Sequence, residues 1–404
     1  MLKVAILGFG TVGGSVYGRL EKSRKTIEEQ IEEPFQITAI LVKDRQKDRA
    51  NLKDVFITTE WEQFKAHQKY DIVFEAIGGI EPAFTYTHYF LEQGIPVISA
   101  NKKLVAQKGE ELEKVATSGG AFYGYEAAVA GAVPIVNALR GTLATTAINQ
   151  VRGILNGTTN YMLTEMIQKG RSFADVLLEA QQLGYAESDP TDDIESFDAW
   201  YKLIILSRLC FGKWADPEQI SRFGVSEIEN WHVEVASDIG CQVKLVGDSR
   251  LEEGEIKGIV SPAFVVNEEL LASINGVTNG VVIYGEDIHE LAFVGPGAGG
   301  AATANSMVED YLFHKRYKGD RVVIAESNSK ESASYDVVFV NQASYGECLH
   351  WAEAHSINII ESIPHAEGEA WIVKDAAVDY LHQPVYQLCG DLNKVKSRQH
   401  SKVL

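Results

Sequence analysis

The first hundred and thirty residues alternate short apolar runs with segments of helical periodicity. The apolar runs predict strands over residues 3–7, 37–43, 71–77, 96–100 and 121–127. Most of these runs are continuously apolar, which is typical of parallel strands that are covered on both faces. Helices are predicted between them, for example from Thr11 to Arg24 and from Gly109 to Ser118. This βαβ order predicts an α/β fold with a doubly wound parallel sheet.

The pattern changes after Ile148 and predicts an α+β region. One strand over 148–155 is followed by a largely helical block from Thr158 to about Gly240. Further strands are predicted near 241–247, 256–266, 281–284 and 289–294, and a helix over 300–316. Residues 317–334 are polar and are the best candidate for a linker. The last seventy residues then have a β-α-β-β order, with strands over 335–341, 357–363 and 369–374 and a helix over 346–355.

Composition and charge exclude several classes of protein. The 404 residues carry a formal net charge of −19, which argues against nucleic acid or an anionic membrane as a main partner. No apolar run is long enough to span a bilayer, and the N-terminal apolar run is broken by glycines, unlike a signal peptide. The four cysteines are scattered and form no CxxC pair. We therefore expect a cytoplasmic protein with reduced thiols and without a zinc site.

A glycine-rich turn follows the first predicted strand directly. Gly8, Gly10 and Gly13 have the GxGxxG spacing and lie between that strand and the first helix. Gly8 permits a tight turn, Gly10 lets a pyrophosphate approach the backbone, and Gly13 lets the helix pack closely on the strand. The pyrophosphate of a dinucleotide would then lie at the helix N-terminus. This context favours a Rossmann-type dinucleotide-binding domain over a structural loop.

The residues after the second predicted strand bear on the choice of dinucleotide. The chain reads Lys43-Asp44-Arg45 there. An acid favours NAD through the ribose hydroxyls, whereas cations favour the additional phosphate of NADP. Because the two cations outnumber the acid, we expect NADP to be weakly preferred and NAD to remain possible.

The most acidic segment runs from Gly184 to Leu203 and ends close to a lysine. Lys202 follows six carboxylates, which are Glu187, Asp189, Asp192, Asp193, Glu195 and Asp198. One interpretation is a solvated acidic loop that leads into an ordinary helix with an i,i+4 ion pair. The other is a site where acids bind a cationic substrate and a lysine transfers a proton. If residues 194–210 are helical, Asp198 and Lys202 lie on one face and can reach one pocket.

Five segments in order resemble the homoserine dehydrogenase family over roughly residues 1–316. Besides the acidic segment, they are SANKKLVA (99–106), GYEAAVAGAVP (124–134), GILNGTTNYMLTEM (153–166) and FVGPGAGGAATA (293–304). Each segment alone is weak evidence for the family, but the combination of all five is specific. The resemblance implies interconversion of L-homoserine and L-aspartate 4-semialdehyde with NAD or NADP, a step of threonine and methionine biosynthesis. It favours the second interpretation of the acidic segment.

The resemblance also implies roles for particular residues in the chemistry. Lys202 matches the family's proton-transfer residue, and Lys102 lies where nicotinamide and substrate meet. Asp198 matches a residue at the substrate hydroxyl, and Glu187 one that binds the substrate ammonium. The remaining substrate positions are Gly157, Thr158 and Tyr185.

Other matched positions concern the cofactor and a cation. The phosphate turn includes Phe9, Thr11 and Val12 in addition to its three glycines. Gly184, Gly297 and Gly299 match positions near the nicotinamide side of the cofactor. A monovalent cation, which we expect to be sodium, is bound in the family largely by main-chain oxygens, at positions that are here Glu126, Val129, Gly131 and Val133.

The resemblance divides the chain into three domains. Residues 1–135, completed by the helix 300–316, would bind the dinucleotide, and 136–299 would bind substrate and form a homodimer. We also expect dimerisation because strands such as 256–266 have apolar faces that need cover. Residues 335–404 would form a small, divergent ACT-like α+β domain. Its turn after the first strand, residues 341–346, lacks the acidic-then-glycine pattern of effector-binding relatives, so threonine is expected to inhibit weakly or not at all.

Two other functions remain open. One is another Rossmann oxidoreductase that acts on an amino acid or semialdehyde. A phosphorylating semialdehyde dehydrogenase would need a nucleophilic cysteine, and no cysteine lies at a plausible strand end. The other is a catalytically weak paralogue that senses amino acids through its C-terminal domain.

Overall fold

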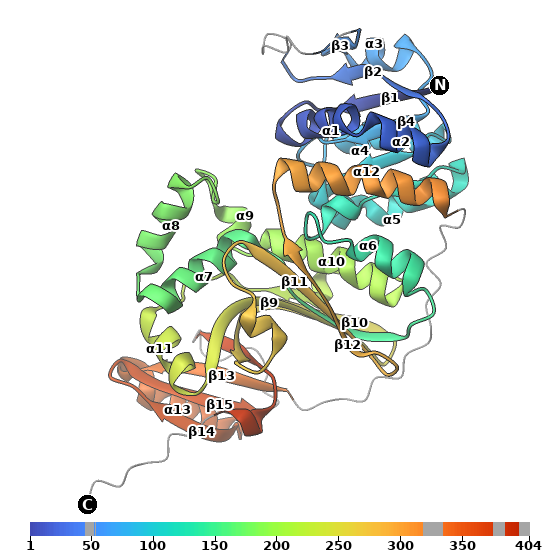
Figure 1. Cartoon of the computed structure of the whole chain (residues 1–404). Coiled ribbons are helices and arrows are strands. Elements are labelled where there is room, and N and C mark those ends of the chain that lie inside the picture. The colour runs from blue at the N-terminus through green and yellow to red at the C-terminus, as the bar shows by residue number, and fades with distance from the viewer. Residues whose placement is uncertain (45–51, 53, 318–333, 375–383, 396–404) are drawn as a thin grey trace, which may run out of the picture.

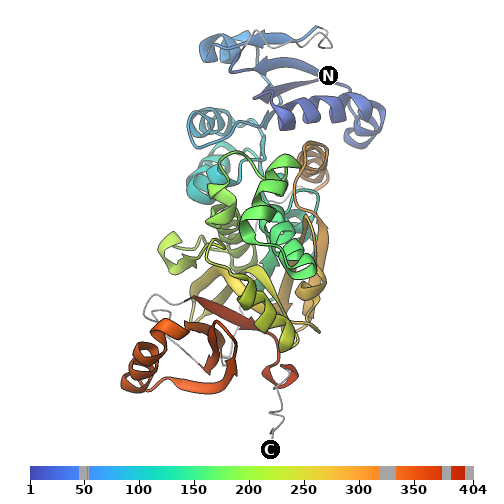
Figure 2. The ribbon, with the colours of Figure 1, turned by 90° about the vertical axis from the view of Figure 1, so that its left-hand side faces the viewer.

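The computed structural model describes residues 1–44, 52, 54–317, 334–374 and 384–395. It has three parts along its length, with the N-terminal sheet at one end and the C-terminal strands at the other (Figures 1 and 2). Among the helices of these residues, none is both long and apolar enough to cross a membrane.

The N-terminal part contains a six-stranded parallel sheet in the order β3-β2-β1-β4-β5-β6. Its strands are β1 (Leu2–Leu7), β2 (Phe35–Leu41), β3 (Phe56–Thr58), β4 (Ile72–Glu75), β5 (Val97–Ser99) and β6 (Tyr123–Gly124). The five predicted strands are confirmed, although β6 has only two residues because a 3-10 helix (Glu126–Ala128) follows it. The short β3 was not predicted. The strand order reverses between β1 and β4, which places a ligand crevice at their carboxyl ends.

Helices cover both faces of this sheet. One face carries α1 (Thr11–Lys22), α2 (Arg24–Ile31) and α12 (Gly300–Arg316), and the other carries α3 (Trp61–His67), α4 (Ala83–Glu92) and α5 (Lys102–Gly119). Alternate residues of β1 pack on opposite layers, so that Val4 and Ile6 contact the first and Ala5 and Leu7 the second. The predicted end of the first helix, at Arg24, is wrong. Helix α1 ends at Lys22, and after Ser23 a separate helix, α2, begins at Arg24.

The middle part combines antiparallel strands with helices. The strands are β7 (Ile148–Ile154), β8 (Ile220–Arg222), β9 (Cys241–Glu252), β10 (Glu255–Val266), β11 (Thr278–Gly285) and β12 (His289–Pro296). The helices are α6 (Ile135–Asn137), α7 (Gly157–Lys169), α8 (Phe173–Gln182), α9 (Thr191–Ile194), α10 (Phe197–Phe211) and α11 (Asn230–Asp238). The predicted helical block is therefore interrupted by β8, which pairs with β10. Helix α10 is buried along most of its length and packs on α5, β7 and β9.

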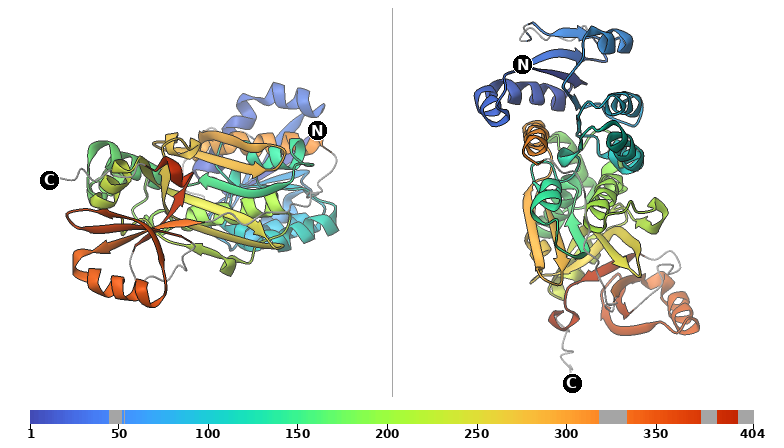
Figure 3. Two further views of the ribbon diagram at one scale, coloured as in Figure 1. Left: turned by 90° about the horizontal axis from the view of Figure 1, so that it is seen from below. Right: turned by 90° about the vertical axis from the view of Figure 1, so that its right-hand side faces the viewer.

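The C-terminal part continues the sheet of the middle part. It consists of β13 (Tyr335–Asn341), α13 (Tyr345–Ala354), β14 (Asn358–Pro364), β15 (Gly368–Lys374) and β16 (Val385–Cys389). This confirms the β-α-β-β order and adds a fourth strand. Strand β16 pairs in parallel with β10 and antiparallel with β13, so one ten-stranded sheet joins the two parts (Figure 3, left). Most of the predicted linker, residues 318–333, lies outside the described residues.

One reason given above for dimerisation is wrong. Strand β10, which contains the predicted strand 256–266, has β9 along one edge and β8 and β16 along the other, and its second half is buried within the chain. Its apolar residues therefore need no cover from another subunit. The exposed apolar side chains of this sheet include Leu291 and Val294 on β12, at the edge of the sheet.

Candidate active site

A polar cleft with a volume of about 930 Å³ lies between the N-terminal sheet and the middle part. The start of α1, the end of β5 and the segment before α12 line one side. The start of α7, the acidic segment and α10 line the other. Most of the predicted site residues meet here, namely Thr11, Val12, Lys102, Gly131, Gly157, Thr158, Gly184, Tyr185, Glu187, Asp198, Lys202, Gly297 and Gly299.

The glycine turn has the geometry that a dinucleotide phosphate requires. Gly8 has a φ of +88°, and a Cβ there would lie 2.6 Å from the Ala76 carbonyl oxygen. A Cβ on Gly13 would lie 2.1 Å from the Gly8 carbonyl oxygen, so helix and strand touch at that point. Gly10 has open space beside it, and it caps α1 without any side-chain hydrogen bond. The first N–H groups of α1 are thus left for an anion.

A second helix N-terminus lies beside the first. Helix α12 starts at Gly300, where a Cβ would lie 2.6 Å from Ser15 Oγ of α1. Its capping residue, Gly299, has a φ of +119° and makes no side-chain cap. Neither α1 nor α12 has an acidic residue in its first turn. Two helix dipoles therefore favour negative charge at this end of the cleft.

A second cavity, of about 960 Å³, continues from the glycine turn along the ends of β2 and β4. Gly8, Phe9 and Gly10 line it together with Lys43 and Asp44, and the last two side chains are exposed. The adenosine half of a dinucleotide fits this position. Arg45 lies outside the described residues.

Three charged side chains form the centre of the first cleft. Asp198 lies in the first turn of α10, and one of its oxygens is 2.7 Å from Lys202 Nζ, one turn further along. Its other oxygen forms an ion pair with Lys102, the first residue of α5. Lys202 Nζ also donates to the Leu155 carbonyl at 2.7 Å. One carboxylate thus forms ion pairs with two ammonium groups, those of Lys102 and Lys202.

The three groups differ in electrostatic environment. Asp198 and Lys202 are buried, whereas the Lys102 side chain is 42% exposed. Burial acts to raise the pKa of Asp198, but the two ammonium groups hold it well below the usual range. Asp198 raises the pKa of Lys102. Burial lowers the pKa of Lys202, and the Lys102 charge lowers it further, against the pull of Asp198. Lys202 is therefore the lysine suited to give and take a proton.

Two further residues that the sequence analysis did not assign belong to this cluster. Asn156 donates from Nδ2 to Asp198 at 2.9 Å and to Asp193 at 2.7 Å. Its Oδ1 accepts from the Thr159 N–H at 2.8 Å and so caps α7. Asn156 precedes the glycine of the NGTTN segment, and asparagine before a helix is an available sign of a cap. Burial raises the pKa of Asp193, which the sequence left among the loop acids.

The start of α7 and the acidic loop are tied together. Thr158 Oγ1 donates to the Tyr185 carbonyl at 2.7 Å, and both residues line the cleft. Glu187 lines the cleft and is exposed. Within the described part of the chain its carboxylate has no ion pair, so it is available to a cationic ligand.

The predicted cation positions form a tight turn that lines the cleft at Gly131. Ala130 and Gly131 both have positive φ, of 49° and 51°. The Glu126 carboxylate accepts from the N–H groups of Val136 and Asn137, and its burial next to Asp310 raises its pKa to about 8. The Gly131 carbonyl accepts from Ser306 Oγ, and Val133 is buried. Within the described residues, no group of three or more His, Cys, Asp or Glu side chains could hold a metal ion. The turn, including Val129, can therefore offer mainly main-chain oxygens.

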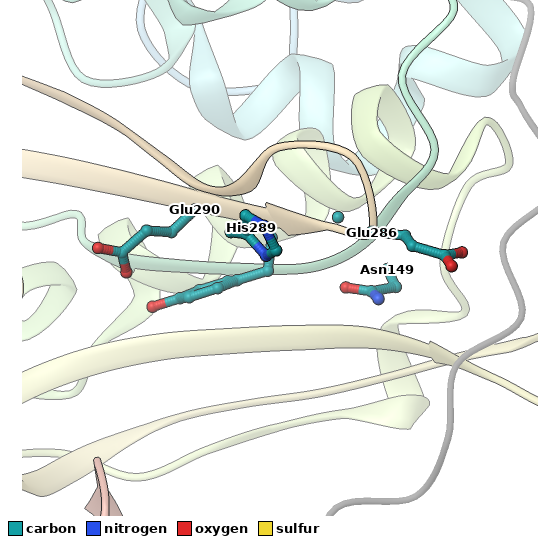
Figure 4. Close-up of a pocket in the computed structure, with 6 residues that line it drawn as sticks. Asn149, Glu286, His289 and Glu290 are labelled. Atoms are coloured by element: carbon teal, nitrogen blue, oxygen red, sulfur yellow. The ribbon is translucent and has the colours of Figure 1, made fainter.

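Another hollow, of about 700 Å³, lies at the turn between β11 and β12 and does not have the charged cluster of the first cleft (Figure 4). Glu286 and Glu290 point in opposite directions from it, and Asn149 and His289 do not converge on a common point. It contains no lysine–carboxylate cluster.

Comparisons with known proteins identify the family of the chain. A family model described as homoserine dehydrogenase, NAD binding domain, matches residues 8–126, and one described as homoserine dehydrogenase matches residues 134–312. The chain belongs to the homoserine dehydrogenase family. The resemblance seen in the sequence is thereby confirmed, as is the binding of a nicotinamide cofactor by the N-terminal domain.

Individual homoserine dehydrogenases are similar over most of the chain. The one from Lactococcus lactis is 39% identical over 77% of this chain and 73% of its own. The crystal structure of that from Thiobacillus denitrificans has a TM-score of 0.83 at 30% identity and covers 96% of this chain and 98% of its own. A hyperthermophilic archaeal homoserine dehydrogenase, solved in complex with NADPH, has a TM-score of 0.67 at 26% identity and covers 79% of this chain and 99% of its own.

Proposed function

We propose that this protein interconverts L-homoserine and L-aspartate 4-semialdehyde with NAD or NADP. The observation that carries the proposal is the Lys102–Asp198–Lys202 cluster, which faces the same cleft as the N-terminus of α1. Alcohol oxidation needs a base for the hydroxyl proton and a hydride acceptor for the carbon that bears the hydroxyl, and this cleft provides for both. The substrate is small and zwitterionic, which suits a cleft that offers both carboxylates and ammonium groups.

Lys202 transfers the proton. In the oxidative direction it removes the hydroxyl proton of homoserine, and in the reverse direction it protonates the forming alkoxide. Asp198 orients Lys202, and Lys102 keeps the pKa of Lys202 low. A bound nicotinamide supplies the hydride acceptor or donor.

Glu187 recognises the substrate ammonium, because it lines the same cleft as the two lysines. Gly157, Thr158 and Tyr185 form the wall against which the rest of the substrate lies. Asp198 serves both recognition of the hydroxyl and orientation of Lys202.

The cofactor is held by the glycine turn, with Phe9, Thr11 and Val12 at the phosphates and Gly184, Gly297 and Gly299 towards the nicotinamide. We propose a weak preference for NADP, since Lys43 and Arg45 outnumber Asp44. We also propose that a monovalent cation binds at Glu126, Val129, Gly131 and Val133, since a single positive charge does not need a cage of carboxylates. Sodium is the natural candidate for such a set of oxygens.

The domain division, the assembly and the location remain proposals. Residues 335–404 form a divergent ACT-like domain, 136–299 the substrate and dimerisation domain, and 1–135 with α12 the dinucleotide domain. The protein works as a homodimer in the cytoplasm, where its four free, buried cysteines stay reduced.

A spectrophotometric assay tests the proposal and separates it from the two alternatives. Homoserine should reduce NADP or NAD, as followed by the absorbance of the reduced nicotinamide, and serine, threonine and alanine should not. Turnover with another amino acid in place of homoserine would favour a different oxidoreductase. Binding of an amino acid without turnover would favour the sensing paralogue.

A further inference from the structure

A buried carboxyl outside the proposed catalytic set lies at the carboxyl end of β4. Glu75 is fully buried, and among the described residues it makes no ion pair. Its side chain accepts two hydrogen bonds, from the Ile77 N–H at 2.6 Å and from Ser99 Oγ at 2.5 Å. Its main-chain carbonyl accepts from the Ala100 N–H at 3.2 Å. A buried acid without a cation is costly, so a role beyond packing is worth seeking.

The hydrogen bonds continue from Glu75 to Lys102. Ser99 Oγ accepts from the Asn101 N–H at 3.0 Å. The Asn101 side chain donates to the carbonyls of Ile77 at 2.8 Å and Gly79 at 2.6 Å, and its Oδ1 caps α5 by accepting from the Leu104 N–H at 3.1 Å. Asn101 immediately precedes Lys102. The network therefore fixes the start of α5 and the position of the Lys102 backbone, from which the side chain extends into the cleft.

The same network shapes both cavities. Ile77 and Gly78 line the cavity assigned to the adenosine half of the cofactor, and Ala100 and Lys102 line the cleft with the catalytic cluster. Glu75 is the one side chain in the network that bonds to both the turn after β4 and the residue that ends β5. A change at Glu75 should thus move both walls together.

We infer that Glu75 is a positioning residue. It couples the turn after β4, which lines the cavity assigned to the adenosine half of the cofactor, to Lys102. Loss of the negative charge of Glu75 loosens the positions of both this turn and Lys102. The inference rests on the proposed function in that it takes Lys102 to lie at the junction of cofactor and substrate.

The ionisation of Glu75 gives the inference a distinctive signature. Burial raises its pKa to about 7, against the effect of its hydrogen bonds from Ser99 and Ile77. The titratable group that faces it from β6 is Tyr123, whose own pKa is raised well above its usual range by burial and by Glu75, so Tyr123 stays neutral. When Glu75 is protonated, one of its oxygens becomes a donor and the hydrogen bond to Ser99 reverses.

The test compares Glu75→Gln with wild type between about pH 6 and pH 8, on either side of the carboxyl pKa. The glutamine amide can still accept from Ile77 and donates to Ser99, so it imitates the protonated acid at every pH. Cofactor affinity is measured by calorimetric titration with NADP and NAD, and kcat by reduction of the nicotinamide. Glu92→Gln, the same substitution at an exposed site on α4, is the control and should behave as wild type.

In wild type, cofactor affinity and kcat should both fall as the pH drops through about 7. Glu75→Gln should show the low cofactor affinity at both pH values, and its kcat should be about tenfold or more below that of wild type at the higher pH, since displacement of a reacting group by about 1 Å can cost about a hundredfold. Ser99→Ala breaks the same link and should lower both quantities, and it replaces the glutamine variant if that variant does not fold.

A wild-type protein whose cofactor affinity and kcat do not change over this pH range would overturn the inference, as would a folded Glu75→Gln with wild-type values. If no variant oxidises homoserine but cofactor affinity still depends on pH in wild type and not in Glu75→Gln, the proposed function fails and the coupling of Glu75 to the cofactor turn stands.

Discussion

Replacing Lys202 by methionine is the sharpest test of the proposed chemistry. Methionine has a similar length and fills the same buried space without a charge. The substitution removes two hydrogen bonds, to Asp198 and to the Leu155 carbonyl, both at 2.7 Å. Asp198 keeps its ion pair with Lys102 and its hydrogen bond from Asn156 at 2.9 Å.

The expected effects on stability and on rate differ in size. Leaving the buried Leu155 carbonyl without its donor should cost about 1–3 kcal/mol of unfolding free energy, against a typical total of about 5–15 kcal/mol. The protein should therefore remain folded. Loss of a positioned acid or base should lower kcat by about 10²–10⁴-fold, equivalent to about 3–5 kcal/mol of transition-state stabilisation.

The assay is homoserine oxidation over a range of pH, with folding checked by circular dichroism and thermal unfolding. In wild type the rate should rise with pH as Lys202 loses its proton, at a pKa below that of an ordinary lysine. This rise should vanish in Lys202→Met. The matched control is Lys213→Met, just beyond the end of α10 and exposed, which should keep wild-type turnover. A folded Lys202→Met that retains more than about a tenth of wild-type kcat, with the same pH dependence, would refute the assigned role.

Four further outcomes are expected. Glu187→Gln should raise the KM for homoserine and leave cofactor affinity nearly unchanged, and an equal loss of cofactor affinity would contradict its assignment to the ammonium. Light scattering at micromolar concentration should show a homodimer, and a species of only 44.5 kDa would argue against it. Threonine should inhibit weakly or not at all, and any inhibition should be competitive with homoserine; potent, cooperative inhibition would instead indicate a working effector site in residues 335–404. Burial lowers the pKa of His232 from its usual 6.5 to about 3, so the folded state binds fewer protons than the unfolded state in acid. The contribution of His232 to stability should therefore fall by about 2 kcal/mol between pH 7 and pH 5, measured by denaturant unfolding as the difference between wild type and His232→Gln at the two pH values.

The parts of the fold that could be predicted from sequence are those specified by local patterns. The parallel strands were visible as apolar runs, and the i,i+4 spacing placed Asp198 and Lys202 on one face of α10. The glycine turn was recognisable because its steric demands concern neighbouring residues, as at Gly8 and Gly13.

Long-range contacts were harder to predict, because periodicity carries no information on which distant segments meet. Spacing alone could not place Lys102 on the carboxylate of Asp198, and only the family resemblance brought it to the site. Asn156 stood inside a quoted segment, yet its bonds to Asp193 and Asp198 depend on how α7 and α10 pack. Strand β16 was missed because its partner, β10, is more than a hundred residues away in the sequence.

The position of β16 has a consequence for synthesis of the chain. Strand β10 pairs through Ala263, Phe264 and Val265 with Gln387, Leu388 and Cys389, which are made more than a hundred residues later. At about 5–20 residues per second, the ribosome needs roughly 6–25 seconds to reach those residues after β10 has been made. During that time an apolar strand edge is open to pairing with other chains. A nascent chain that stalls in this interval should depend on chaperones, and premature stop codons after residue 334 should yield aggregated protein instead of a shorter active enzyme.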